Sequence, residues 1–446
     1  MPYPDLTAMN SPMELVKVLG RGIGVVSPDQ VTPLLAPDIP ALREWHDRTR
    51  ARRLALPSNQ LEALGRLTIL VPTRERQDFL IRLVAVWGGT PVRLVLVDGS
   101  DYPVSATHRD VIESAENVSY VHAPLSYPER MKLAGTFVST PYAVLSGDDE
   151  LLLPAGLVAA IQLLDQDPGL VGCVGQCLRF FPTRRSHRLM FEMGYPYWRY
   201  RRDEGSAEQR ILHAMDGYNA ATCYAILRSD VWTESWGSVE EWSCSTATEV
   251  QQAIAVLARG RLATVDELFW LRSEENPPID LAERRRLTLA EWWRSVEHAE
   301  ESRRYVASLA ADLENAAAIP SAQSREVVAS AVDALVATHD AMNHAGQEAR
   351  RRVGRRVGRG IRSAGLKLLG RFIPDAGLVR IRDFLARVGS VLGYSDERFL
   401  GGPRSAARRC PAALLEANPD MASVLADVET VVGTFHRARA IRGTRR

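Results

Sequence analysis

Residues 140–154 read TPYAVLSGDDELLLP, where the apolar run 142–145 ends directly in the polar sequence SGDDE at 146–150. A short apolar run that is closed by turn-forming residues is typical of a buried strand. Stretches that can form helices, such as 77–87 and 157–164, separate this run from others of the same kind. Strands and helices that alternate at this spacing predict an α/β domain whose sheet is mostly parallel and flanked by helices. The other strands that we expect cover 67–71, 92–97, 118–121 and 171–174.

The domain organisation follows from where these strand signals begin and end. Residues 1–65 predict a helical N-terminal extension, which includes a charged run at 43–53. The predicted strands lie within residues 66–285. Residues 286–446 contain Ala-, Glu- and Arg-rich segments that predict helices and no strands. At roughly 100–200 residues per domain, a chain of 446 residues allows this division. We therefore expect an α/β domain between a helical extension and a helical C-terminal region.

Composition and charge narrow the class of protein. The chain is 46% hydrophobic and 24% charged, which is ordinary for a globular protein. Its 55 Lys and Arg balance 54 Asp and Glu, so the chain as a whole is not suited to binding nucleic acid. The longest apolar stretch, 151–164, is too short to span a bilayer, and no secretory signal opens the sequence. Five scattered cysteines argue against a disulfide framework, so we expect a cytoplasmic protein.

Polar residues follow three of the expected strands. The carboxyl ends of parallel strands share one edge of the sheet, where ligands bind in open α/β folds. A single Asp after a strand is usually a turn former or a helix cap, but three polar strand ends at one edge favour a site. The adjacent carboxylates of Asp148, Asp149 and Glu150 repel one another unless a cation sits between them. A Mg²⁺ or Mn²⁺ ion that also binds substrate phosphates accounts for them, because such ions take one or two carboxylates. The three polar strand ends are 72–76, 98–100 and 147–150.

Several of these segments resemble the nucleotide-binding half of family-2-type glycosyltransferases, which have the GT-A fold. The resemblance extends over residues 66–275, and the order and spacing of its segments are more specific than any one of them. It implies a GT-A-like fold and the transfer of a sugar from a nucleoside diphosphate, with UDP the commonest nucleotide, by displacement with inversion. The matching segments are LTILVPTRER at 67–76, LVLVDGS at 94–100, Lys132-Leu133, TPYAVLSGDDELLLP at 140–154, Thr248-Glu249 and FWLR at 269–272.

The resemblance implies a role for each matching residue around the donor. It makes Asp98 the acceptor of a hydrogen bond from the nucleotide base, and it places Asp148 against the ribose or the donor sugar. It makes Asp149 the direct ligand of a Mn²⁺ or Mg²⁺ ion, and it brings Arg272 to the diphosphate. The other residues that it places around the nucleotide sugar are Pro72, Thr73, Arg76 and Lys132.

The catalytic base that the resemblance implies is Glu249, which precedes Gly260 at the family's spacing. A carboxylate there can take the proton of the acceptor. The family's usual Glu-Asp pair reads Thr248-Glu249 in this chain, so Glu240 and Glu241 are rival candidates. Glu249 can also be a surface carboxylate early in a helix.

Two other functions stay open at this point. A nucleotidyltransferase also uses carboxylates at strand ends, but its glycine-rich loop has no counterpart in Arg74-Glu-Arg76. A non-catalytic nucleotide-binding scaffold of the same fold is consistent with Gly147, which stands where the first Asp of the common D-x-D motif would lie. The acceptor is equally open, because a lipid-linked glycan, a small molecule and a peptide all fit.

A basic segment, residues 350–372, carries nine Lys and Arg and no acid. Val353, Val357 and Ile361 recur within it at near-helical spacing, which is typical of a basic amphipathic helix on a membrane surface. Five glycines weaken such a helix, and a solvated face or a flexible linker are the alternatives. Attachment to the inner face of an anionic membrane is one hypothesis for this segment, and homo-oligomerisation is another use of the helical regions.

Overall fold

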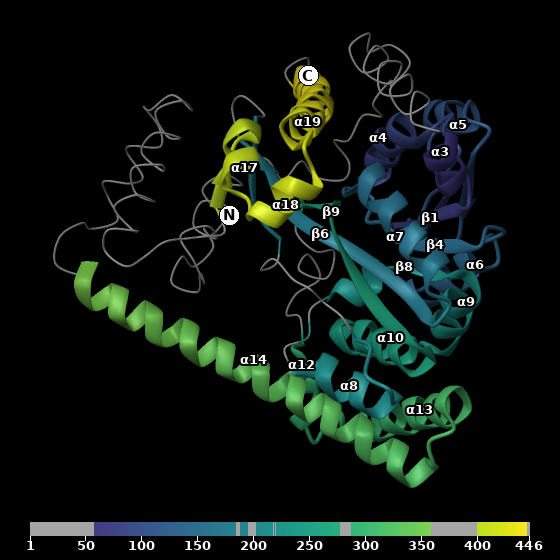
Figure 1. Cartoon of the computed structure of the whole chain (residues 1–446), viewed down its shortest axis with the longest axis vertical. Coiled ribbons are helices and arrows are strands. Elements are labelled where there is room, and N and C mark those ends of the chain that lie inside the picture. The colour runs from purple at the N-terminus through teal and green to yellow at the C-terminus, as the bar shows by residue number, and fades with distance from the viewer. Residues whose placement is uncertain are drawn as a thin grey trace.

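The computed structural model describes residues 58–183, 188–194, 202–216, 218, 220–276, 287–357 and 399–443. It shows an α/β fold in which helices cover a central sheet (Figure 1). The fold class predicted from the sequence is therefore confirmed. Of the predicted extension 1–65, only α3 (Ser58–Gly65) lies within the described residues. The predicted basic segment is described only as far as residue 357.

One half of the sheet is parallel, as the sequence predicted. Its strands are, in spatial order, β3 (Val118–His122), β2 (Arg93–Asp98), β1 (Leu67–Thr73) and β4 (Tyr142–Leu145). The helices between them are α4 (Gln77–Trp87), α5 (Ala106–Glu113) and α6 (Tyr127–Gly135). The side chains of β1 and β4 are almost all buried, which explains why both strands read as continuous apolar runs. Thr73 lies opposite Asp98 in the register, so the ends of β1 and β2 meet at one edge.

The other half of the sheet is mixed. The long strands β6 (Leu170–Pro182) and β9 (Arg261–Ser273) run parallel to each other. β7 (Leu189–Met193) is antiparallel to β6, and β8 (Ile226–Arg228) is antiparallel to both β6 and β4, so β8 joins the two halves. β5 (Leu151–Leu152) follows the acidic residues directly and pairs with the end of β9, Leu151 opposite Leu271. This pairing brings the acidic residues 148–150 to the end of β9.

Helices pack closely on this framework. A Cβ atom on Gly156 of α7 (Pro154–Gln166) would lie 2.5 Å from the Cα of Phe269, so the approach of α7 to β9 requires glycine. The side chains of α10 (Ser245–Arg259) are buried along most of its length. The remaining elements of this part are η4 (Ala220–Tyr224), α8 (Ala207–Met215), α9 (Ser229–Ser238), α12 (Leu289–Arg294), α13 (Ala299–Ala317) and α14 (Ser321–Val357).

The C-terminal residues 399–443 pack onto the mixed half of the sheet (Figure 1, yellow). β10 (Phe399–Gly401) adds an antiparallel edge strand to β7, so this region is not purely helical. Glu429 accepts a hydrogen bond from the backbone of Leu189 at 2.7 Å, and Asn418 accepts one from Leu268 at 2.9 Å. None of the described helices has both the length and the apolar character that crossing a membrane requires. The helices here are α17 (Pro403–Arg409), α18 (Ala412–Ala417) and α19 (Met421–Gly443).

Candidate functional site

Three buried carboxylates form the centre of the site. Asp148, Asp149 and Glu150 lie between β4 and β5, and they are 4%, 8% and 6% exposed. Burial, and then the charge of Asp149, raise the pKa of Asp148 above its ordinary value and raise the pKa of Glu150 to about 8. The three acids are therefore crowded at the edge where the sequence predicted a site.

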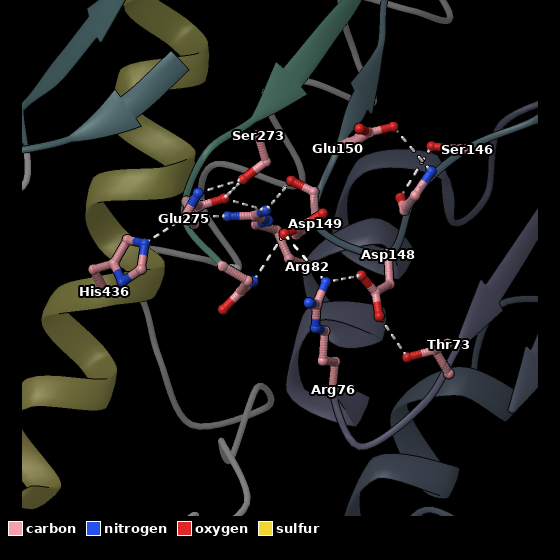
Figure 2. Close-up of polar contacts among 12 residues, drawn as sticks. Thr73, Arg76, Arg82, Ser146, Asp148, Asp149, Glu150, Ser273, Glu275 and His436 are labelled. Carbon is pink, nitrogen blue, oxygen red and sulfur yellow. Dashed lines mark hydrogen bonds and ion pairs between the residues drawn. The ribbon is translucent and has the colours of Figure 1, made fainter. Parts of the chain in front are cut away.

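Two residues at the end of β1 contact the acid pair Asp148–Asp149. Thr73 Oγ1 donates a hydrogen bond to Asp148 Oδ2 at 2.7 Å. Arg76 Nη1 lies 3.6 Å from Asp148 Oδ1 and 3.6 Å from Asp149 Oδ2 (Figure 2). The repulsion between neighbouring carboxylates is thus relieved by a guanidinium of the same chain.

A strained backbone precedes Arg76. Glu75 has φ of 55°, a left-handed conformation that costs a non-glycine residue about 1–3 kcal/mol. Two hydrogen bonds hold it there: Glu75 N donates to Ser100 Oγ at 2.8 Å, and Asp101 N donates to Glu75 Oε1 at 3.0 Å. The loop after β2 therefore fixes the turn that leads into Arg76.

A buried ion pair supports the backbone of Asp149. Arg82 Nη2 donates to the carbonyl oxygen of Asp149 at 2.6 Å and to Glu275 Oε2 at 2.7 Å, and the side chains of Arg82 and Glu275 are 0% and 1% exposed. The Arg82 guanidinium lies 4.9 Å from the ring centroids of both Phe79 and Phe435. His436 of α19 contacts the other oxygen of Glu275 (Figure 2). Although burial acts to raise it, Arg82 and His436 hold the pKa of Glu275 well below its usual range.

The segment after β9 also reaches the acids. Asn276 Nδ2 donates to Asp149 Oδ2 at 2.8 Å. Glu150 is held elsewhere, because its Oε2 accepts hydrogen bonds from Trp270 Nε1 at 3.0 Å and from Gly147 N at 3.2 Å. A Cβ atom on Gly147 would lie 2.9 Å from the Glu150 side chain, which accounts for glycine at this position. Asp148 and Asp149 thus face Arg76, whereas Glu150 is bonded to β9.

Asp98 is fully buried at the end of β2 and has several donors within the chain. Ser100 N donates to its Oδ1 at 2.9 Å, and Gln77 Nε2 and the Tyr120 hydroxyl donate to its Oδ2 at 2.6 and 2.7 Å. These bonds anchor the start of α4 and β3 at the edge of the sheet. Pro72 is paired with Val97 in the same register, one residue before Thr73.

The structure brings Arg130 of α6, rather than Lys132, to the end of β1. Arg130 is 5% exposed and donates through Nη1 to the backbone carbonyl of Thr73. A Cβ atom on Gly99 would lie 2.6 Å from Arg130 Nε, so glycine makes room for this guanidinium. Lys132 is exposed in the last turn of the same helix, and none of the hydrogen bonds and ion pairs given above involves it. The sequence did not single out Arg130, Arg82, Asn276, Glu275 or His436.

Glu249 lies half-buried in the early part of α10. Its Oε1 accepts a hydrogen bond from the Tyr218 hydroxyl at 3.0 Å. Burial, and then the charges of Cys223, Glu249 and Glu150, raise the pKa of Tyr127. Tyr127 therefore lies within electrostatic range of both the predicted base and Glu150.

The other predicted residues lie in different surroundings. Arg272 on β9 has its guanidinium 6.0 Å from the Trp270 ring centroid and acts to lower the pKa of Glu150, so it lies near the cluster. The rival base Glu240 forms an ion pair with Arg304 at 3.4 Å. Glu241, the second rival, is exposed beside it.

The acid pair Asp148–Asp149 fits a Mg²⁺ or Mn²⁺ ion that is held jointly by the protein and by substrate phosphates. In the described residues, no group of three or more His, Cys, Asp or Glu side chains could hold a metal by itself. One oxygen of each of the two acids lies at the same distance from a single positive nitrogen of Arg76, which acts as a stand-in cation. Two carboxylates are enough for such an ion, because the substrate phosphates supply its other ligands.

Comparisons with known proteins found only distant structural similarity. No family model matches the sequence, and no curated protein is significantly similar to it. Solved structures of S. aureus TarS residues 1–349 match with 12% identity and a TM-score of 0.35 over 63% of this chain and 92% of that one. The same protein in complex with UDP-GlcNAc matches with 12% identity and a TM-score of 0.34, with the same coverage. Similarity at this level says nothing about activity, and the α/β fold described above rests on this chain's own strand order.

Proposed function

We propose that this chain is a glycosyltransferase that moves a sugar from a nucleoside-diphosphate sugar, with UDP as the nucleotide, to a nucleophilic acceptor. The observation that carries the proposal is the buried acid pair Asp148–Asp149 at the carboxyl edge of the parallel strands, facing one cation. Open α/β sheets bind their ligands at this edge. The resemblance of residues 66–275 to family-2-type glycosyltransferases supports the same assignment.

The leaving diphosphate needs positive charge. Asp149, with Asp148 beside it, would hold a Mn²⁺ or Mg²⁺ ion, which when bound stabilises negative charge on phosphate oxygens. Arg76 adds positive charge at Asp148 and Asp149, and Arg272 adds positive charge near Glu150. Thr73 orients the Asp148 carboxylate through its hydrogen bond.

The acceptor needs a base. Glu249 would take the proton of the attacking group, and the Tyr218 hydroxyl positions its carboxylate. Attack from the face opposite the diphosphate gives a single displacement with inversion. This assignment leaves Glu150 without a chemical step, because Trp270 and Gly147 bind its carboxylate.

The donor site is tested by thermal unfolding with UDP, GDP, dTDP and CDP, each with and without Mn²⁺. A ligand at about 100 times its Kd adds about 2.7 kcal/mol, which raises the Tm by several degrees. We expect a manganese-dependent shift with UDP that Asp149→Ala removes. The matched control is Asp165→Ala, which removes a half-exposed acid paired with Arg66.

The outcomes separate the glycosyltransferase from the non-catalytic scaffold. A UDP shift together with sugar transfer or UDP release from a UDP-sugar supports the glycosyltransferase. A metal-dependent shift with no turnover of any donor indicates the non-catalytic scaffold instead. No shift with any of the four nucleotides contradicts the donor site itself.

A further inference from the structure

Arg76 lies where a single cation can interact with both Asp148 and Asp149. Its Nη1 lies at 3.6 Å from one oxygen of Asp148 and from one oxygen of Asp149, and its side chain is 18% exposed. Asp148 and Asp149 are 5% and 11% exposed as side chains, so solvent screens this contact weakly. The guanidinium of Arg76 therefore contributes positive charge to both acids of the pair.

The other partners of the pair do not replace this charge. Thr73 and Asn276 are neutral donors to Asp148 Oδ2 and Asp149 Oδ2. Arg82 contacts the backbone oxygen of Asp149, and both of its terminal nitrogens are bound to Glu275. The charge of Arg82 is thus balanced by its own acid, whereas Asp148 and Asp149 share Arg76.

Arg76 lies in the loop between β1 and α4. The residue follows directly on Glu75, whose left-handed backbone is held by the Ser100 and Asp101 contacts. It stands before the first turn of α4, as the N-cap residue. Arg76 thus lies outside both β1 and α4, so rotation about its side-chain bonds requires no shift of either element.

We propose that Arg76 is the built-in counter-ion of Asp148 and Asp149, and that it has to leave their oxygens before a divalent ion can take them. This inference rests on the proposed donor site and adds a coupling to it. Two cations that share the same pair of oxygens repel, so without nucleotide Arg76 opposes metal binding. With a diphosphate present the released guanidinium has a new anionic partner, and Arg76 then favours the complex.

The test compares two affinities in the full chain: that of Mn²⁺ alone, and that of UDP at saturating Mn²⁺. We expect Arg76→Gln to bind Mn²⁺ alone at least tenfold more tightly than wild type, because the competing charge is gone. The same variant should bind UDP with Mn²⁺ at least tenfold more weakly. Free Mn²⁺ is measured by its electron paramagnetic resonance signal, and UDP by titration calorimetry.

The opposite signs of the two effects distinguish this role from a structural one. A variant that merely loosens the site binds both ligands more weakly, which would overturn the proposal. Arg76→Lys keeps the charge, so its Mn²⁺ affinity should stay close to that of wild type. Arg66→Gln, which removes a half-exposed arginine bound to Asp165, should change neither affinity.

Failure of this inference differs from failure of the proposed function. Tighter Mn²⁺ binding by Arg76→Gln without binding of any nucleoside diphosphate keeps the counter-ion role and removes the donor site. Unchanged Mn²⁺ affinity in Arg76→Gln overturns the counter-ion role. The counter-ion role is also overturned if UDP binds without metal and Arg76→Gln abolishes that binding. In that case Arg76 itself would take the place of the metal.

Discussion

At the residue scale, three consecutive acids have three different sets of partners. Asp148 is bonded to Thr73, Asp149 to Asn276, and Glu150 to Trp270. The partners come from β1, from the segment after β9 and from β9 itself, so the pairing of β5 with β9 decides which acid faces where. Asp148 and Asp149 remain as a pair that faces a cation, and Glu150 becomes part of the framework.

The assignment of Glu249 as the base gives a prediction about turnover. Glu249→Gln keeps the size and the hydrogen bond from Tyr218 but cannot accept a proton. We expect kcat to fall by roughly 10²–10⁴-fold while the Kd for UDP with Mn²⁺ stays unchanged. Glu240→Gln, at the rival acid paired with Arg304, should leave both values near those of wild type.

The measurement is initial-rate kinetics on a donor that the thermal-shift experiment has identified, alongside UDP titration. A Glu249→Gln enzyme with near-wild-type kcat would show that the base lies elsewhere. A large loss in Glu240→Gln would transfer the role to that residue.

The sequence predicted the acids of this site better than its arginines. Asp148, Asp149, Thr73 and Arg76 stand at strand ends, where local pattern alone indicates an edge of the sheet. Arg82 and Glu275 are 193 positions apart, so no local spacing reveals their pairing. One signal was present: Arg82 interrupts the apolar run FLIRLVAVW of α4, and a buried arginine requires an acid. The resemblance implies Lys132, yet Arg130 is the buried cation of that helix.

At the element scale, α19 is joined to α4 through Glu275. Phe435 packs on Phe79 with ring centroids 5.0 Å apart, and His436 contacts the acid that binds Arg82. The helix nearest the end of the chain thereby supports the backbone under Asp149. The sequence predicted that this region is helical. It did not predict β10, because an edge strand of three residues is too short to show a hydrophobic pattern.

This junction predicts a pH-dependent loss of stability. Glu275→Gln leaves the Arg82 charge buried without its acid, which should lower the free energy of unfolding by about 3–5 kcal/mol at pH 7. The pKa of Glu275 is lowered in the folded chain, so its contribution is present above the unfolded value of about 4.3 and is lost as the pH falls below it. The difference between variant and wild type should therefore shrink below about pH 4.

Urea unfolding at several pH values measures this difference. Glu300→Gln is the control, because it removes an acid from the exposed Arg303–Glu300 pair and should change the stability by less than about 1 kcal/mol. Equal stability of Glu275→Gln and wild type at pH 7 would mean that the buried pair is not held in solution.

At the scale of the whole molecule, the candidate site lies between β4 and β5, whereas α14 packs on α8, α12 and α13 (Figure 1). α14 has 37 residues, which corresponds to a length of about 55 Å. Its N-terminal part is buried through residues such as Val328, Val332 and Leu335. The sequence at its C-terminal end begins the basic segment 350–372, with five arginines between 350 and 356.

Membrane attachment through this segment, which begins within α14, is testable on the full chain. Each basic residue near an anionic surface contributes about 1 kcal/mol, so we expect co-sedimentation with phosphatidylserine vesicles, weakened by salt, and none with neutral vesicles. Replacement of the five arginines by Gln should abolish it, whereas five Gln replacements at exposed arginines elsewhere should not. Equal sedimentation with anionic and neutral vesicles would contradict the attachment, because charge is its only proposed source. The arginines to replace are Arg350, Arg351, Arg352, Arg355 and Arg356, and the controls are Arg303, Arg325, Arg404, Arg408 and Arg409.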